Sequence, residues 1–267
     1  MTFINNITCK NIICKNIFFG TYKLLDYDIL HTSLDCAYKV GYRHFDCAEL
    51  YKNQHMIGEF FKKNNISRDS YWITSKLSFR TIPKGEIEMR KSIEKTLSDL
   101  NTNYIDLMLI HAPCKNDIIA WKILTEYKNN NIIKNIGISN YNITNLERFL
   151  DNISNKDDIY CNQIEFNPFL NRRELITMCN NYNIIIITYG NIYKSNNVIE
   201  DIALGYGKSK EQILLQYARM KNFNIIVTST NCDYIKIDFD LFFTISENDM
   251  NILDNMNEDF SLYKRFL

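Results

Sequence analysis

Short apolar runs alternate with amphipathic segments along most of this chain, and the alternation predicts a parallel α/β protein. Strands are expected at residues 44–46, 71–76, 104–111, 133–139, 159–165, 184–189 and 225–228. Helices are expected at residues 27–40, 53–63, 84–100, 118–127, 145–150, 172–181, 198–206, 210–220 and 247–256. The run of four isoleucines at 184–187 lacks polar alternation, as expected of a strand that is buried on both faces.

The N-terminal region supplies the remaining strand. Residues 3–9 and 12–19 are predicted to form a hairpin that is followed by, or merges into, the first barrel strand. Pro83 is expected in the first turn of its helix, and Ser246 with Asp249 gives a capping signal for the last one. With eight strand-plus-helix units, we predict a (β/α)8 TIM barrel with an N-terminal β-hairpin, formed by residues 1–267 as a single domain.

Ionisable side chains stand where several of these strands end. Asp46, Lys76 and His111 each close an apolar run, and Tyr51 follows Asp46 by five residues. The carboxyl ends of parallel strands meet at the mouth of a barrel, where such enzymes gather their catalytic residues. We therefore expect these four side chains to converge.

Their chemistry suits the reduction of a carbonyl group. A half-buried Lys76 needs a nearby carboxylate, and Asp46 on the neighbouring strand can supply it. A phenol beside an ammonium loses its proton more readily, so Tyr51 can serve as a general acid toward a carbonyl oxygen that receives a hydride. His111 can stabilise the developing charge as a hydrogen-bond donor. Two alternatives stay open: an Asp–Lys pair that only supports the barrel, and a structural histidine.

The charge balance points to a small-molecule ligand. With 31 basic and 31 acidic residues the net charge is zero, and no basic stripe indicates nucleic acid or an anionic membrane as a partner. The apolar stretches fall short of the roughly 20 residues that a membrane span needs. We expect a soluble, cytoplasmic protein that is a monomer rather than an oligomer.

The eight cysteines show neither a CxxC pair nor zinc-ligand spacing, so no metal site is predicted. Because the chain starts without a secretory signal pattern, reduced thiols are expected. Cys47, next to Asp46, is either a reactive thiol or, as we favour, a small buried filler.

Five ordered segments resemble the aldo-keto reductase family: GYRHFDCAELYKN at 41–53, SYWITSKL at 70–77, NYIDLMLIHAP at 103–113, IGISNYN at 136–142 and YCNQIEFNPF at 160–169. The resemblance implies a barrel that binds NADPH or NADH without a Rossmann sheet and reduces an aldehyde or ketone. It matches Asp46, Tyr51, Lys76 and His111 to the catalytic tetrad, with Tyr51 as the proton donor.

The same resemblance implies the remaining site residues. It matches Ser139, Asn140 and Gln163 to the residues that bind the nicotinamide carboxamide, and Tyr189 to the ring that stacks on the nicotinamide. The expected cofactor-binding set is completed by Gly20, Thr21, Ser229 and Thr230. The expected substrate-pocket positions are Tyr22, Ser78 and Ala112.

Three departures from the family pattern shape the expectations. Thr228 and Tyr234 replace the lysine and arginine that bind the 2′-phosphate of NADP in the family. A relaxed preference between NADP and NAD is therefore predicted. The loop after Tyr189 predicts a shortened cofactor lid. Ser78 and Ala112 replace aromatic residues and the C-terminus is short, which together predict a wide, polar substrate entrance.

Two other functions are alternatives to carbonyl reduction. The first is a dinucleotide-binding regulatory or redox-sensing barrel with little or no catalysis, which the weakened phosphate grip favours and the intact tetrad opposes. The second is a phosphate-binding isomerase or aldolase, which would need a glycine-rich phosphate site near the end of the barrel. The chain has only isolated glycines there, at positions 190, 205 and 207.

Overall fold

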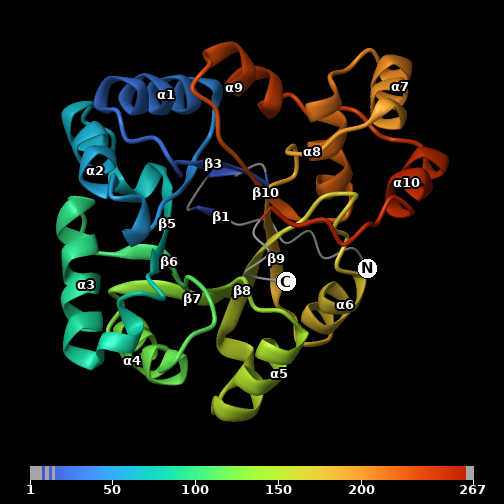
Figure 1. Ribbon diagram of the computed structural model, residues 1–267. Coiled ribbons are helices and arrows are strands. Elements are labelled where there is room, and N and C mark those ends of the chain that lie inside the picture. The colour runs from blue at the N-terminus through green and yellow to red at the C-terminus, as the bar shows by residue number, and fades with distance from the viewer. Residues whose placement is uncertain (1–7, 10–11, 14–15, 263–267) are drawn as a thin grey trace.

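A computed structural model, describing residues 8–9, 12–13 and 16–262, shows a closed barrel of parallel strands surrounded by helices (Figure 1). The barrel strands are β3 (Ile17–Gly20), β4 (His44–Asp46), β5 (Trp72–Leu77), β6 (Ile105–Ile110), β7 (Ile133–Ser139), β8 (Ile159–Glu165), β9 (Ile185–Tyr189) and β10 (Asn224–Val227). They follow one another around the barrel in chain order, and β10 closes it by pairing with both β9 and β3. The predicted (β/α)8 fold is confirmed.

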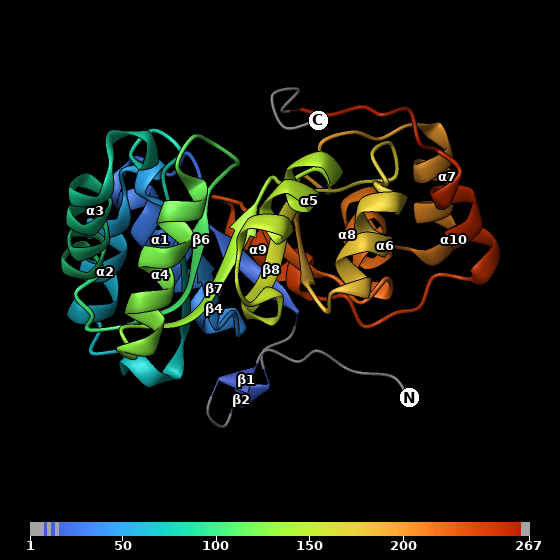
Figure 2. The same cartoon turned by 90° about the horizontal axis from the view of Figure 1, so that it is seen from below.

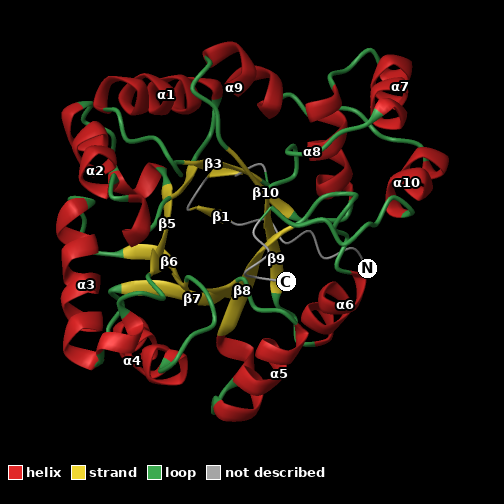
Figure 3. Ribbon diagram, in the orientation of Figure 1, coloured by secondary structure: helices red, strands yellow, loops and turns green. Residues whose placement is uncertain are grey.

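Helices cover the outside of the barrel (Figure 3). They are α1 (Tyr27–Val40), α2 (Gln54–Lys63), α3 (Glu86–Asp99), α4 (Asp117–Asn129), α5 (Ile143–Asn152), α6 (Arg173–Asn181), α7 (Asn197–Tyr206), α8 (Lys210–Met220), α9 (Cys232–Phe239) and α10 (Glu247–Asp254). Within the described part of the chain, none of them is long and apolar enough to cross a bilayer.

The N-terminal hairpin is present as two short antiparallel strands, β1 (Thr8–Cys9) and β2 (Ile12–Ile13). It precedes β3 instead of merging with it, and it lies beneath the barrel in Figure 2, at the end away from the described C-terminal segment. The rest of the predicted strand at 3–9 lies outside the described residues.

Two helix predictions need correction. Pro83 lies in a separate 3-10 turn (Ile82–Lys84), because Gly85 adopts a φ of 103° that ends this turn before α3 begins at Glu86. Helix α9 was not predicted at all. The capping role of Ser246 is confirmed, since its side chain accepts a hydrogen bond from the Asp249 amide.

The strands bury both of their faces, as the unbroken apolar runs predicted. On β3, Ile17 and Phe19 belong to the core between the sheet and the helices, whereas Phe18 points into the barrel interior with Trp72 and Leu107. The Phe18 ring stacks on His44 at a centroid distance of 3.5 Å. The barrel is therefore filled with side chains beneath its C-terminal mouth, and a ligand can enter only above this layer.

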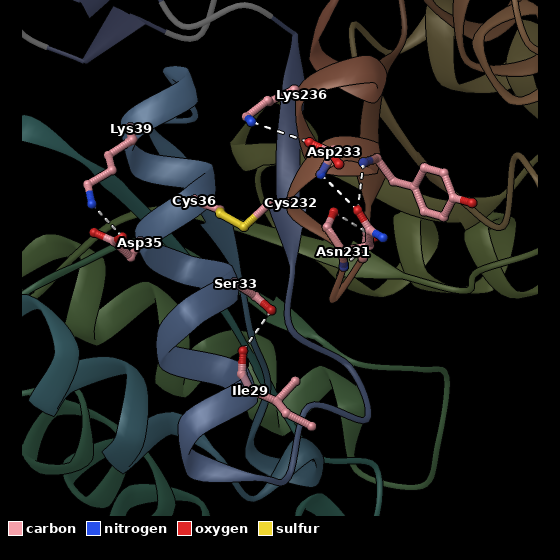
Figure 4. Close-up of a disulfide and its surroundings, with 11 residues drawn as sticks. Ile29, Ser33, Asp35, Cys36, Lys39, Asn231, Cys232, Asp233 and Lys236 are labelled. Atoms are coloured by element: carbon pink, nitrogen blue, oxygen red, sulfur yellow. Dashed lines mark hydrogen bonds and ion pairs between the residues drawn. A yellow bond between two sulfur atoms is a disulfide. The ribbon is translucent and has the colours of Figure 1, made fainter.

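The prediction of reduced thiols is wrong for Cys36 and Cys232, which form a disulfide between α1 and α9 (Figure 4). Their Cα atoms lie 5.7 Å apart although 196 positions separate them in the sequence. The helices are neighbours because the strands that precede them, β3 and β10, close the barrel. A crosslink over so long a loop is expected to stabilise the fold by about 2–4 kcal/mol.

A buried carboxylate on α9 predicts a pH-dependent stability. Asp238 is 6% exposed, and burial together with the nearby Glu211 raises its pKa to about 7. Because folding raises this pKa, the carboxyl group favours the folded state at a pH below its pKa in the unfolded chain. That contribution to stability is lost as the pH rises toward 7. We expect Asp238→Asn to stabilise the protein by about 1–3 kcal/mol near pH 8 and to have little effect near pH 4. Urea unfolding at the two pH values measures this. An equal effect of the substitution at both would contradict it.

Candidate active site

A pocket of about 600 Å³ opens at the carboxyl ends of the barrel strands. Nine of the residues expected at the site line it: Gly20, Tyr22, Asp46, Tyr51, His111, Ser139, Asn140, Gln163 and Tyr189. The other lining residues are Leu50, Phe79, Arg80, Gly190, Asn191, Ile192, Tyr193, Leu215, Ile226, Val227 and Thr228.

A buried ion pair lies at the bottom of the pocket. Lys76, at the end of β5, is 1% exposed, and its ammonium contacts the Asp46 carboxylate at the end of β4. The other carboxylate oxygen accepts a hydrogen bond of 2.8 Å from the Gln163 side chain. Lys76 Nζ also donates to the carbonyl oxygen of Cys47 at 3.0 Å. A buried pair needs such additional hydrogen bonds to offset its desolvation.

Tyr51 reaches this pair from the 3-10 turn Glu49–Tyr51, which follows β4. Lys76 Nζ donates to its hydroxyl oxygen at 3.2 Å and lies 4.9 Å from the centre of its ring. The loop is held in place by the Asn53 side chain, which donates to the carbonyl oxygens of Thr21 and Leu24 at 2.8 and 2.9 Å. The sequence separation of five residues is thus long enough to fold the phenol back over the barrel.

His111 stands beside Tyr51, with 5.8 Å between their ring centroids. Burial, with a smaller contribution from the Lys76 ammonium, lowers the pKa of His111 well below its usual value, so the imidazole is neutral near pH 7. Its Nδ1 atom is buried without a hydrogen-bond partner. The four side chains expected to meet at the mouth therefore lie within one contiguous cluster.

A polar wall formed by β7, β8 and β9 stands across the pocket. Asn140 adopts a left-handed φ of 63°, and its side chain donates to the His111 carbonyl oxygen at 2.9 Å and accepts from the Tyr189 hydroxyl at 2.6 Å. The Ser139 hydroxyl donates to the main-chain oxygen of Gln163 at 2.9 Å. Carboxamide, hydroxyl and aromatic groups thus line one side of the cavity, next to the ion pair.

The first and last strands approach each other closely at Gly20. A Cβ atom there would lie 2.5 Å from the Thr228 hydroxyl and 2.7 Å from an Ile226 methyl group, so a side chain would push β3 away from β10. Thr21, also expected to bind the cofactor, is fully buried and bonds the Asp46 carbonyl oxygen through its hydroxyl at 2.9 Å. Thr21 therefore bonds the main chain of the site and does not line the pocket.

Two loop residues expected to bind the cofactor do not line the pocket. Ser229 and Thr230 lie in the loop between β10 and α9, and Thr228 is the residue of this loop that faces the cavity. The Ser229 hydroxyl accepts a hydrogen bond of 3.1 Å from the Asn231 amide. It stabilises the turn that leads into α9.

The expected substrate wall is displaced by one residue. Ser78 and Ala112 are 0% and 1% exposed and do not line the pocket. The Ser78 amide donates a hydrogen bond of 2.8 Å to the Glu49 carboxylate. Phe79 lines it instead, with its ring centroid 5.9 Å from that of His111. An aromatic wall is therefore present, contrary to the polar entrance that was expected.

Cys47 is a structural residue. It is 0% exposed, its thiol donates to the Thr74 carbonyl oxygen at 3.1 Å, and burial raises its pKa to about 12. The filler interpretation is confirmed, because a buried thiol of such high pKa is unreactive at neutral pH.

The loop after β9 brings Ile192 and Tyr193 to the pocket. It is joined to the segment after α10 by the ion pair between Lys194 and Glu258, and the Lys194 ammonium lies 4.4 Å from the Phe169 ring centroid. Sequence reasoning missed these residues, as it missed Leu215 on α8, because aromatic and apolar side chains in loops and helices carry no signal of facing a cavity. In the described residues no group of three or more His, Cys, Asp or Glu side chains could hold a metal ion.

Comparisons with known proteins agree with this geometry. An uncharacterized oxidoreductase of Schizosaccharomyces pombe is 31% identical over 88% of this chain and 86% of its own. The methylglyoxal reductase DkgB of Salmonella typhimurium is 30% identical over 79% of this chain and 80% of its own. The crystal structure of MGS-M4, an aldo-keto reductase enzyme from a deep-sea metagenome library, superposes with a TM-score of 0.88 at 26% identity and covers 96% of both chains.

The sequence profile of the Aldo/keto reductase family matches residues 16–195, which include the strand ends that carry Asp46, Lys76, His111 and the polar wall. The matched segment covers more than half of the chain, and the barrel and the pocket at its mouth agree with it. The chain belongs to the aldo/keto reductase family of oxidoreductases.

Proposed function

We propose that this protein reduces an aldehyde or ketone to an alcohol with NADPH or NADH, and that Tyr51 is the general acid. One observation carries the proposal: the Lys76 ammonium contacts both the Asp46 carboxylate and the Tyr51 hydroxyl at the bottom of the pocket. Relatives named as aldehyde reductase and methylglyoxal reductase support the same reaction class.

Tyr51 is the proposed proton donor to the carbonyl oxygen. Its hydroxyl oxygen accepts the hydrogen bond from Lys76, so the phenolic proton can be donated into the pocket. The phenolate that results is stabilised by the adjacent ammonium. Asp46 and Gln163 act through Lys76, because they hold the ammonium in position and balance its charge in a buried environment.

His111 positions the carbonyl oxygen. A proton on Nδ1 would be a buried donor without an acceptor, which is costly, so the neutral ring carries its proton on Nε2. A neutral imidazole with this tautomer can donate a hydrogen bond to the substrate oxygen without competing with Tyr51 as a strong acid.

The polar wall fits a nicotinamide. Ser139, Asn140 and Gln163 offer hydroxyl and carboxamide groups to a carboxamide, and the aromatic ring of Tyr189 lines the same pocket. When bound, the reduced nicotinamide supplies the hydride. Gly20 leaves the cavity open beside β10, where any other residue would fill it.

The loop after β10 predicts a relaxed cofactor preference. Thr228 faces the pocket, and Tyr234 is 61% exposed at the start of α9, so neither position offers a cation to a 2′-phosphate. We expect KM values for NADPH and NADH to differ by less than about a hundredfold, because charge-assisted phosphate bonds are missing here. Steady-state kinetics with both cofactors measures this. A stronger preference for NADPH would contradict it.

A turnover assay tests the proposed function. The purified protein is mixed with NADPH or NADH and 4-nitrobenzaldehyde, and the loss of reduced nicotinamide absorbance is followed, with cofactor binding measured separately by fluorescence. Alcohol formation supports the reductase. Cofactor binding without turnover would instead support the alternative of a dinucleotide-binding regulatory or redox-sensing barrel.

A further inference from the structure

We infer that the substrate carries a carboxylate and that Arg80 binds it; the inference rests on the proposed function. Arg80 follows β5 in the loop that also brings Phe79 to the cavity, and both residues line the pocket. Its guanidinium carbon lies 6.0 Å from the Phe79 ring centroid. A guanidinium at a pocket wall can hold a carboxylate through two parallel hydrogen bonds.

The charge of Arg80 is not compensated within the described lining of the pocket. Asp46 is the acidic residue there, and the Lys76 ammonium already neutralises it. His111 is neutral near pH 7 because its pKa is lowered. None of the ion pairs among residues 16–262 includes Arg80, which is an exposed residue. Among the residues that line the pocket, the positive charge of Arg80 thus has no acidic partner, which favours an anionic ligand.

Arg80 lies in the loop after β5, across the barrel from the proposed cofactor wall. In the closed barrel, β5 stands opposite β9, and the wall formed by Asn140, Gln163 and Tyr189 belongs to β7 through β9. Phe79 connects Arg80 to the catalytic cluster, since its ring lies 5.9 Å from that of His111. A carboxylate on Arg80 would therefore belong to the substrate.

Aromatic and apolar side chains line the same pocket as Arg80 and the catalytic cluster. They include Phe79, Leu50 and Tyr22, whose ring packs 5.0 Å from the Tyr51 ring. This arrangement fits a carbonyl group at one end of the substrate, a flat or short apolar spacer in the middle, and a carboxylate at the other end. Aromatic and short aliphatic aldehyde acids have this chemistry.

A pair of matched aldehydes tests the inference. 4-Carboxybenzaldehyde and 4-nitrobenzaldehyde have planar groups of similar shape at the same ring position, and only the first is charged. The ratio of their kcat/KM values is measured for the wild type, Arg80→Gln and Arg80→Lys, with Lys62→Gln as the control. Lys62 is exposed on α2 and outside the pocket, so this control removes the same charge elsewhere.

We expect Arg80→Gln to lower the ratio of carboxylate to nitro substrate about five- to tenfold, Arg80→Lys to lower it less, and Lys62→Gln to leave it unchanged. The difference between the variants cancels the intrinsic reactivity of the two aldehydes. A ratio within about twofold of wild type in Arg80→Gln, or an equal drop in Lys62→Gln, overturns the inference. If the wild type does not reduce 4-nitrobenzaldehyde either, the proposed function fails and the inference falls with it.

Discussion

Replacement of Tyr51 by phenylalanine is expected to lower kcat/KM for 4-nitrobenzaldehyde by about 10²–10⁴-fold, the usual contribution of a general acid. The substitution removes the hydroxyl group that accepts a hydrogen bond of 3.2 Å from the Lys76 ammonium, and it leaves the ring in place. Because this hydroxyl is the proposed proton source, the loss should appear in kcat. Affinity for the dinucleotide should change little, since the proposed cofactor wall belongs to β7 through β9.

Tyr22 provides a matched control for this experiment. It lines the same pocket, and its ring centroid is 5.0 Å from that of Tyr51, but the described hydrogen bonds of Lys76 do not include it. We expect Tyr22→Phe to keep kcat within severalfold of wild type. Equal losses in the two variants, or a Tyr51→Phe protein that keeps more than about a tenth of its activity, would remove Tyr51 from the role of general acid.

Much of the barrel could be predicted because its elements carry local signals. Helix α1 has the predicted bounds, since Asp26 caps its first turn and Gly41, at a φ of 118°, ends it. Strands β4, β7 and β8 also have the predicted bounds. Helix α9 was missed because it is only eight residues long and directly follows the loop after β10. The disulfide was missed because closure of the barrel brings Cys36 next to Cys232. The spacing of the two cysteines in the sequence does not indicate this contact.

The catalytic cluster could be predicted from the sequence because of the geometry of a parallel barrel. Neighbouring parallel strands carry their carboxyl ends to the same mouth of the barrel. Asp46 on β4 pairs with Thr74 on β5, two residues before Lys76, so the two side chains emerge close together there. Loop residues have no such constraint. Ser78 was expected in the pocket wall, but its amide turns toward Glu49 and the next residue, Phe79, faces the cavity. The direction of a side chain in a loop depends on such tertiary hydrogen bonds, which a single sequence does not display.

The buried ion pair raises the question of whether Lys76 and Asp46 serve only to support the barrel. We expect Lys76→Met to lower the free energy of unfolding by about 3–5 kcal/mol, because it leaves the Asp46 carboxylate, 3% exposed, without its cation. Activity should fall as well, since the Tyr51 hydroxyl loses its cationic neighbour. Denaturant unfolding and steady-state kinetics measure the two effects on the same protein.

The double variant Asp46→Asn with Lys76→Met separates support of the barrel from catalysis. It removes both charges, so no uncompensated ion stays buried, and the Gln163 side chain can still bond the residue at position 46. We expect most of the stability lost in Lys76→Met to return, because a buried pair can often be replaced by uncharged side chains at little cost. Activity should stay low, since the ammonium next to Tyr51 is still missing. A double variant that regained both stability and turnover would mean that the pair only holds the barrel together, and that Tyr51 donates its proton without help from Lys76.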